Sequence, residues 1–268
     1  MHQKLILTLI LAWVSASCNA SDGGVREQAA RIAAQIRRAD YEGDRATLKK
    51  CYDELTPFLK NEELASRIRY WRGFDLWRSA INGFNDSVDP NELERDLRQA
   101  VDEFKAAMQK DQAFVDAKIG MISCLGYLAF MKRADTAAMQ DLMGQMSPLV
   151  KEAKAVAPDN PRLHWVLGPI LRYQAHESGS GTEELIENYE TGLQHCSNAE
   201  QDKNSLEPSW GKPELLVSLA YMYLNRNPPN VEAAESKARS ALEIVPYWHY
   251  TRDILLPQIL AAKAKTNR

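Results

Sequence analysis

The sequence predicts an all-α protein, a superhelical array of antiparallel helix pairs with a C-terminal capping helix. Almost every segment after residue 24 carries apolar residues at helical spacing, and the breaks between segments are short and polar. Alternation typical of strands is nearly absent. One spacing of small and large residues recurs in four of the expected helices, which is the pattern of a repeat architecture.

The chain divides into five helix pairs and one last helix. The pairs are expected at 25–41 with 44–59, 62–82 with 91–110, 113–132 with 136–156, 160–176 with 182–196, and 213–226 with 231–245. At the first break, Gly43 can end one helix and Asp44 can cap the next. The polar stretch 197–213 connects the fourth pair to the fifth. The last helix, 249–265, contains Pro257, so we expect it to be kinked or broken there.

Residues 231–246 hold the clearest copy of the repeated spacing. Ala234, Ala238 and Ala241 lie four and three positions apart, and Pro246 follows five positions later. The other copies are Ala100, Phe104, Ala107 and Gln112; Met146, Val150, Ala153 and Pro158; and Leu185, Tyr189, Gly192 and Ser197. Small side chains let neighbouring helices approach closely, so each pair can stack on the next and bury a continuous core.

The first helices of three pairs carry a small residue at a matching place, namely Gly73, Gly168 and Ala220. On these residues and the repeated spacing, the chain resembles the tetratricopeptide repeat (TPR) family over about residues 62–246. Residues 25–60 would then be a degenerate first unit within a segment 21–61, and residues 247–268 a capping helix and tail. The terminal positions 112, 158, 197 and 246 are spaced more widely than the roughly 34 residues of that family, so longer loops are expected.

Residues 1–20 have the layout of an export signal. Met1 to Lys4 is weakly basic, Leu5 to Val14 is apolar, and small residues follow. The apolar run is too short to span a bilayer. Two processing routes stay open: cleavage after Ala20, or lipidation of Cys18 in a "VSASC" sequence that resembles a bacterial lipobox. We therefore expect an exported protein, periplasmic or anchored to a membrane as a lipoprotein.

Composition and cysteine spacing exclude several classes of function. The 268-residue chain is 45% hydrophobic and 26% charged with a net charge of −3, and it has no extended basic run that would indicate a nucleic-acid partner. Beyond Cys18 there are Cys51, Cys124 and Cys196, without the paired spacing of a zinc site or a disulfide framework. Cys51 and Cys124 lie in apolar helical patterns and are expected to be buried. No catalytic, metal or cofactor motif is present, so no enzyme activity is expected.

The resemblance implies a concave groove lined mainly by the first helix of each unit. Carried over to this chain, the lining positions are Arg67, Tyr70, Phe74, Trp77 and Arg78 in the second pair, and Arg162, Trp165, Pro169, Arg172 and Tyr173 in the fourth. Arginines mixed with aromatic rings could hold an extended peptide or an acidic group. In the alternative interpretation, Tyr70, Phe74 and Trp165 are core residues between units and the arginines are ordinary surface.

The matching positions of the fifth pair are less basic. They are Glu214, Val217, Tyr221, Leu224 and Asn225, so a ligand should favour the N-terminal and middle units. We expect a protein-interaction scaffold of the bacterial cell envelope that binds a protein or peptide in this groove and meets the membrane only through its lipid anchor. The alternative is a small-ligand-binding repeat lipoprotein that accompanies a periplasmic solute transporter.

Overall fold

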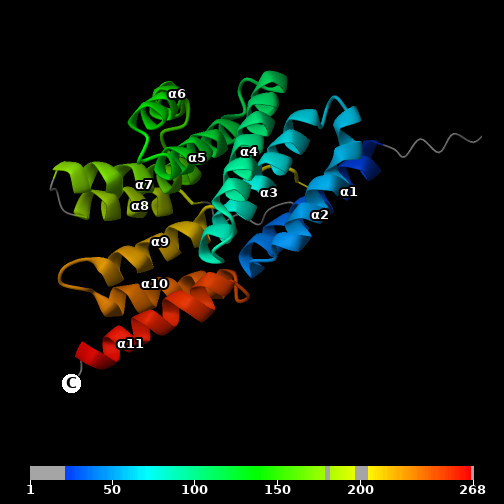
Figure 1. The fold of residues 1–268 in the computed structure, drawn as a ribbon. Coiled ribbons are helices and arrows are strands. Elements are labelled where there is room, and N and C mark those ends of the chain that lie inside the picture. The colour runs from blue at the N-terminus through cyan, green and yellow to red at the C-terminus, as the bar shows by residue number, and fades with distance from the viewer. Residues whose placement is uncertain (1–21, 179–181, 197–204, 267–268) are drawn as a thin grey trace, which may run out of the picture.

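The structure is a computed structural model that describes residues 22–178, 182–196 and 205–266 (Figure 1). The described residues form helices and no strands. The helices are α1 (Asp22–Glu42), α2 (Arg45–Leu55), α3 (Ala65–Asn85), α4 (Pro90–Lys110), α5 (Val115–Met131), α6 (Thr136–Val156), α7 (Pro161–Ser178), α8 (Glu183–Gln194), α9 (Lys212–Asn225), α10 (Val231–Ile244) and α11 (Leu256–Thr266). A 3-10 turn (Thr56–Lys60) follows α2, and a π-helix (Tyr250–Leu255) precedes α11.

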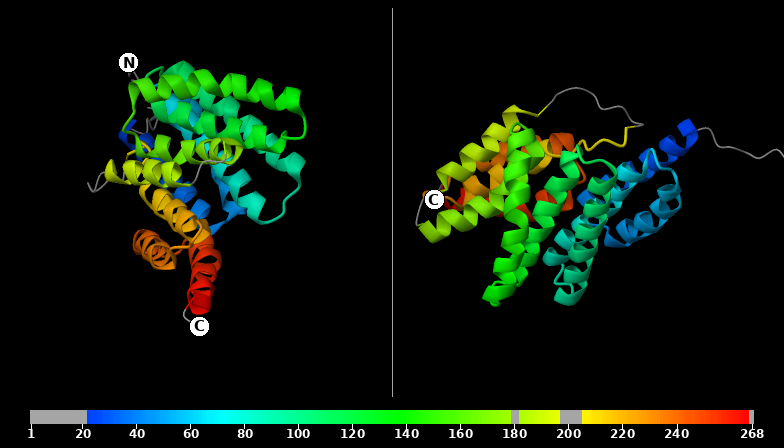
Figure 2. Two further views of the ribbon diagram at one scale, coloured as in Figure 1. Left: turned by 90° about the vertical axis from the view of Figure 1, so that its left-hand side faces the viewer. Right: turned by 90° about the horizontal axis from the view of Figure 1, so that it is seen from above.

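Successive helices pack as pairs, and the pairs stack in order along the chain (Figure 2). The first helices of the pairs also contact one another in the row α1, α3, α5, α7 and α9, which forms the inner layer. The outer layer is formed by the second helices of the pairs, which are α2, α4, α6, α8 and α10. The predicted all-α solenoid of TPR-like helix pairs is confirmed.

The small residues of the repeated spacing are the contact points between helices. Ala234, Ala238 and Ala241 are all fully buried. A β-carbon added at Gly168 would overlap the ring of Tyr189, which belongs to the next helix. Close approach at these positions explains why the array can be recognised from the sequence.

Local sequence sets the start of several helices. Gly43 adopts a φ of 74°, a left-handed conformation that favours glycine, and the next residue caps α2. The Asp44 side chain accepts a hydrogen bond of 3.0 Å from the amide of Thr47. Asp135 and Asn230 cap α6 and α10 in the same way. The predicted break at Glu42-Gly43-Asp44 is confirmed.

The chain is not broken at Pro257, because α11 continues through this residue, and the helix is distorted in the turns just before it instead. Residues Tyr250–Leu255 form a π-helix and α11 continues from Leu256. Just before this π-helix, the ring of Trp248 packs on Tyr41 of α1 with centroids 4.9 Å apart. The segment that leads into the last helix therefore contacts the first helix of the array.

None of the helices in the described residues is long and apolar enough to cross a membrane. Cys51 and Cys124 are free and buried, as expected. The proposed signal segment 1–20, with Cys18, lies outside the described residues.

Two glycine substitutions test the helix contacts. We expect Gly168→Ala to destabilise the protein by about 1–3 kcal/mol, because its methyl group must displace the Tyr189 ring. Gly144→Ala on α6 is the matched control. An added β-carbon there meets nothing within 4 Å, so it should stabilise the helix by roughly 0.5–1 kcal/mol. Urea unfolding of both variants measures the difference, and equal effects would contradict the close contact.

Candidate functional site

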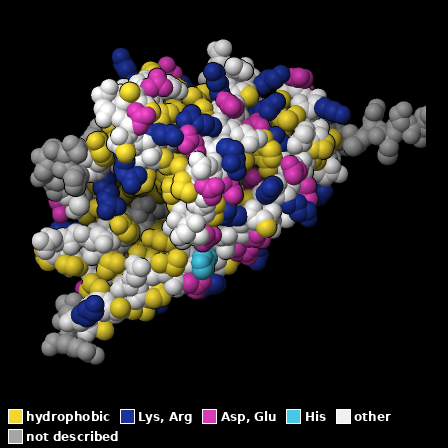
Figure 3. All heavy atoms as spheres, viewed as in Figure 1, with side chains coloured by type: hydrophobic (Ala, Val, Ile, Leu, Met, Phe, Trp, Pro, Cys, Tyr) yellow, Lys and Arg dark blue, Asp and Glu magenta, His cyan; other side chains and the backbone are white. Residues whose placement is uncertain are grey.

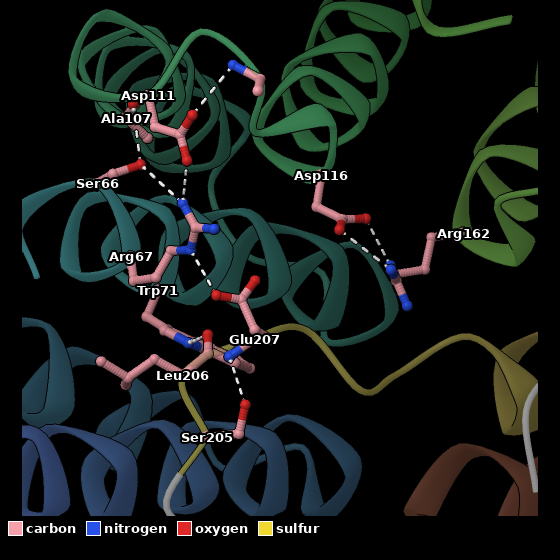
Figure 4. A network of polar contacts seen from close by, with 11 residues as sticks. Ser66, Arg67, Trp71, Ala107, Asp111, Asp116, Arg162, Ser205, Leu206 and Glu207 are labelled. Atoms are coloured by element: carbon pink, nitrogen blue, oxygen red, sulfur yellow. Dashed lines mark hydrogen bonds and ion pairs between the residues drawn. The ribbon is translucent and has the colours of Figure 1, made fainter. Parts of the chain in front are cut away.

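The inner layer of the array is crossed by residues 205–211, which we call the strap (Figure 4). The strap contains no helix and leads directly into α9. Two of its side chains, Leu206 and Trp210, are buried in the core. A segment that belongs to the polar connection 197–213 is therefore an integral part of the packed interior.

Side chains of the inner helices hold the strap largely through its backbone. The indole Nε1 of Trp71 donates to the Leu206 carbonyl at 2.8 Å, and a guanidinium nitrogen of Arg162 donates to the Trp210 carbonyl at 3.3 Å. The Trp210 indole donates in turn to the hydroxyl of Tyr70 at 2.8 Å. These contacts satisfy polar groups that the packing removes from water.

Trp210 is the centre of an aromatic cluster. Its ring centroid lies 5.8 Å from that of Phe74 and 5.5 Å from those of Trp77 and Trp165. The tilted and edge-on angles are the arrangements that aromatic pairs favour. This cluster joins α3, α7 and the strap.

Two of the arginines that contact the strap, Arg67 and Arg162, are held by carboxylates. Arg67 donates to Glu207 of the strap at 2.8 Å and to Asp111 at the end of α4 (Figure 4). Arg162 makes two hydrogen bonds to the Asp116 carboxylate, at 2.6 and 3.1 Å. Both arginines therefore make ion pairs within the protein that stabilise the inner face.

This arrangement corrects the predicted open groove. Tyr70, Phe74, Trp77 and Arg78 are all buried, because the strap and neighbouring helices cover them. Tyr70, Phe74 and Trp77 belong to the packed interior, whereas Arg78 reaches the wall of a recess described below. The core interpretation left open for Tyr70 and Phe74 is the one that the structure shows.

The remaining predicted residues are distributed over two recesses and the strap contacts. Arg67 and Arg162 are partly exposed, but each is engaged as described above. Trp165 is half-buried, while Arg172 and Tyr173 are exposed. Arg78, Trp165 and Arg172 meet at one recess, whereas Tyr173 lies at the other.

The first recess, which we call the polar cavity, has a volume of about 320 Å³. It is enclosed by α3, α7, α8, α9 and the segment around residues 248–250. Its lining residues are Arg78, Ile81, Asn82, Asn85, Trp165, Pro169, Arg172, Leu185, Tyr189, Glu214, Val217, Ser218, Tyr221, Met222, Trp248 and Tyr250. It thus combines predicted positions of the second, fourth and fifth pairs.

Two buried charged residues, Arg78 and Glu214, lie at the wall of the polar cavity. Arg78 forms an ion pair with Asp40, at 2.8 Å from Nε to Oδ1. The carboxylate of Glu214 accepts from the Tyr41 hydroxyl at 2.6 Å and from the Gly211 amide at 2.7 Å. Burial raises the pKa of Glu214, and the nearby Arg78 charge partly opposes this.

The second recess, which we call the apolar recess, has a volume of about 510 Å³. It lies among α5, α6 and α7. Its lining residues are Ile122, Ser123, Gly126, Tyr127, Ala129, Phe130, Arg133, Met139, Met143, Met146, Val166, Pro169, Ile170 and Tyr173. Phe130 and Tyr173 are 57% and 54% exposed, which is unusual for large aromatic residues.

The strap and the apolar recess were not foreseen as binding features. Leu206 and Trp210 are large apolar residues in an otherwise polar stretch, and this contrast is the only local signal of the strap. Within the described part of the chain, no group of histidine, cysteine or acidic residues could hold a metal ion. Basic and acidic side chains are interspersed on the face seen in Figure 3, without a large area of one sign.

Comparison with known proteins supports the fold. No family model matches the sequence, and no curated protein matches it. Among solved structures, the chain is similar to TTC0263, described as a thermophilic TPR protein in Thermus thermophilus. The TM-score is 0.56 at 15% sequence identity, over 88% of this chain and 99% of that one. The fold is that of an all-α TPR-like solenoid.

Replacement of Trp210 tests the strap. We expect Trp210→Ala to lower the free energy of unfolding by about 3–5 kcal/mol, because a buried indole and its aromatic contacts are lost. The control is Glu207→Gln in the same segment. It weakens an ion pair with Arg67 in which Glu207 is the exposed member, so its cost should stay below about 1 kcal/mol. Chemical denaturation measures both, and a Trp210→Ala cost as small as the control would contradict the buried strap.

Proposed function

We propose that this protein is a non-catalytic interaction scaffold of the bacterial cell envelope that binds an amphipathic helix of a partner protein in the apolar recess. The observation that carries the proposal is an incomplete contact between two units of the array. The strap covers the α3 positions Tyr70, Phe74 and Trp77 of the predicted groove, so we place the partner on another surface.

The contact between the third and fourth pairs differs from its counterparts. α4 packs closely on α5, and α8 packs on α9, as expected where one unit stacks on the next. In contrast, α6 packs closely on α5 but scarcely touches α7. The apolar recess occupies this opened junction, where one side of α6 lacks a helix to pack against.

The chemistry of the recess suits an apolar helix. Met139, Met143 and Met146 lie on one face of α6, and methionine side chains adapt to differently shaped partners. Phe130 at the rim is large and mostly exposed, a feature of protein-binding surfaces. The guanidinium of Arg133 lies 4.4 Å from the Phe130 ring, so an acidic residue beside the apolar face of the partner would be favoured.

Site-specific crosslinking tests this surface. A photoreactive amino acid at Phe130 should give one discrete adduct in the native envelope, and mass spectrometry should locate the crosslink on the apolar face of a partner helix. Ile244 on α10 is the matched control, because its side chain is also large and exposed, at 46%, but lies outside the recess. Met143→Asp should abolish the Phe130 adduct, since it places a charge in the apolar contact.

Equal adducts from Phe130 and Ile244 would contradict the proposal. So would a Phe130 adduct that persists in a folded Met143→Asp variant. Circular dichroism of that variant separates lost binding from lost structure.

We also propose export, with Cys18 as a lipid anchor. The support is the order of basic, apolar and small residues in 1–20. If Cys18 is lipidated, the mature chain should begin at that residue with added acyl mass and sediment with membranes. Cys18→Ser should then release it into the soluble fraction. An unmodified mature chain that starts at Ser21 would instead indicate cleavage after Ala20.

A second candidate function is the binding of a small molecule in the polar cavity. Its volume is at the lower end of the range of small-molecule sites, and helices from three pairs enclose it. An extended peptide would have less room there than on an open groove. This function does not depend on the apolar recess.

A further inference from the structure

The polar cavity has a buried guanidinium in its wall with donor capacity to spare. Arg78 is 4% exposed, and its only hydrogen bond among the described residues runs from Nε to Asp40. The Nη1 atom is covered by protein and has no partner, whereas Nη2 is not among the covered atoms and makes no hydrogen bond within the described residues. Because an arginine can donate five hydrogen bonds and an unmet buried donor is costly, this side chain is suited to a ligand with acceptor atoms.

A second guanidinium lines the same cavity from α7. Arg172 is exposed, and its Nη1 makes a long hydrogen bond of 3.4 Å to the hydroxyl of Tyr221. The guanidinium also lies 5.2 Å from the centroid of the Tyr221 ring. Arg172 therefore adds positive charge to the accessible side of the cavity.

The acidic groups near these arginines are engaged by the protein itself. Both oxygens of Glu214 accept hydrogen bonds, from Tyr41 and Gly211. Asp40 accepts from Arg78 and also from the amide of Asn82. Both carboxylates are thus engaged in contacts within the protein. The hydrogen-bonding groups still available to a ligand are mainly the N–H donors of Arg78 and Arg172.

Aromatic side chains form much of the remaining wall. Trp165, Tyr189, Tyr221, Trp248 and Tyr250 all line the cavity. The Trp165 indole already donates to Ser218 at 3.0 Å, so its ring offers mainly an apolar surface. Tyr250 begins the π-helix, a type of distortion that is frequent at functional sites.

We propose that the polar cavity binds a small aromatic carboxylic acid. The carboxylate accepts hydrogen bonds from the Arg78 guanidinium, Arg172 contributes its positive charge at the mouth, and the ring lies against the aromatic wall. Charge-assisted hydrogen bonds to a planar carboxylate are those that arginine forms best. This inference rests on the second candidate function and is independent of the apolar recess.

Calorimetric titration with a matched pair of probes tests the inference. We expect phenylacetate to bind about tenfold or more tightly than phenylacetamide, which has the same ring but no charge. Arg172→Gln should weaken phenylacetate binding about fivefold or more, because its side chain lines the cavity from an exposed position. Arg133→Gln, at the apolar recess, is the control and should leave the affinity unchanged.

A variant of the buried arginine gives a second measurement. Arg78→Lys keeps a positive charge beside Asp40 but loses the planar set of donors, so it should weaken phenylacetate at least as much as Arg172→Gln. If that variant does not fold, the Arg172 and Arg133 pair still decides. Absence of phenylacetate binding at millimolar concentration, equal binding of the amide, or an Arg172→Gln affinity equal to wild type would each overturn the inference.

A cationic probe separates this inference from the function on which it rests. If phenethylamine binds in the cavity and phenylacetate does not, the carboxylate assignment is wrong while small-molecule binding stands. The crosslinking experiment on the apolar recess is unaffected by either result.

Discussion

The packing of Trp210 against the inner helices holds the strap on the inner face of the array and so determines which surfaces are accessible to a ligand. Its indole lies within 6 Å, between ring centroids, of Phe74, Trp77 and Trp165, and it donates to Tyr70. Burying so large an aromatic side chain stabilises a fold by several kcal/mol. The strap thus occupies the inner face that an open solenoid would offer to a peptide.

Two recesses remain open in the described part of the chain, one beside the strap and one away from it. The polar cavity lies beside the strap, where Arg78 and Glu214 are held by partners from α1. The apolar recess lies at the junction where α6 and α7 do not pack closely. One is partly polar and small, the other apolar and larger, so they suit different classes of ligand and can be tested separately.

The sequence predicts the array because its contacts are local and repeated. Ala234, Ala238 and Ala241 share one helix face, and this spacing is visible without knowing what they touch. The strap is different. Trp71 and Leu206 are 135 positions apart, and Tyr70 and Trp210 are 140 apart, so no periodicity links them. Inner-facing residues could be assigned from the resemblance, but what covers them could not.

The apolar recess could not be predicted from the sequence for a related reason. The recess exists because α6 and α7 do not pack closely, and the apolar pattern of either helix does not indicate how closely the two units approach. Arg172 and Tyr173 are neighbours in the sequence, yet they line different recesses because adjacent helical residues point about 100° apart. Only the packing of α7 between the two recesses separates their roles.

The most direct test of this account is the environment of Trp210 in solution. Fluorine NMR of the protein labelled with 5-fluorotryptophan, with the resonance assigned through Trp210→Phe, measures its access to a soluble paramagnetic agent. The account predicts a signal as well protected as that of the fully buried Trp77, because Trp210 is only 3% exposed. Broadening as strong as that of free 5-fluorotryptophan would show that the strap leaves the inner face open, and would contradict the account.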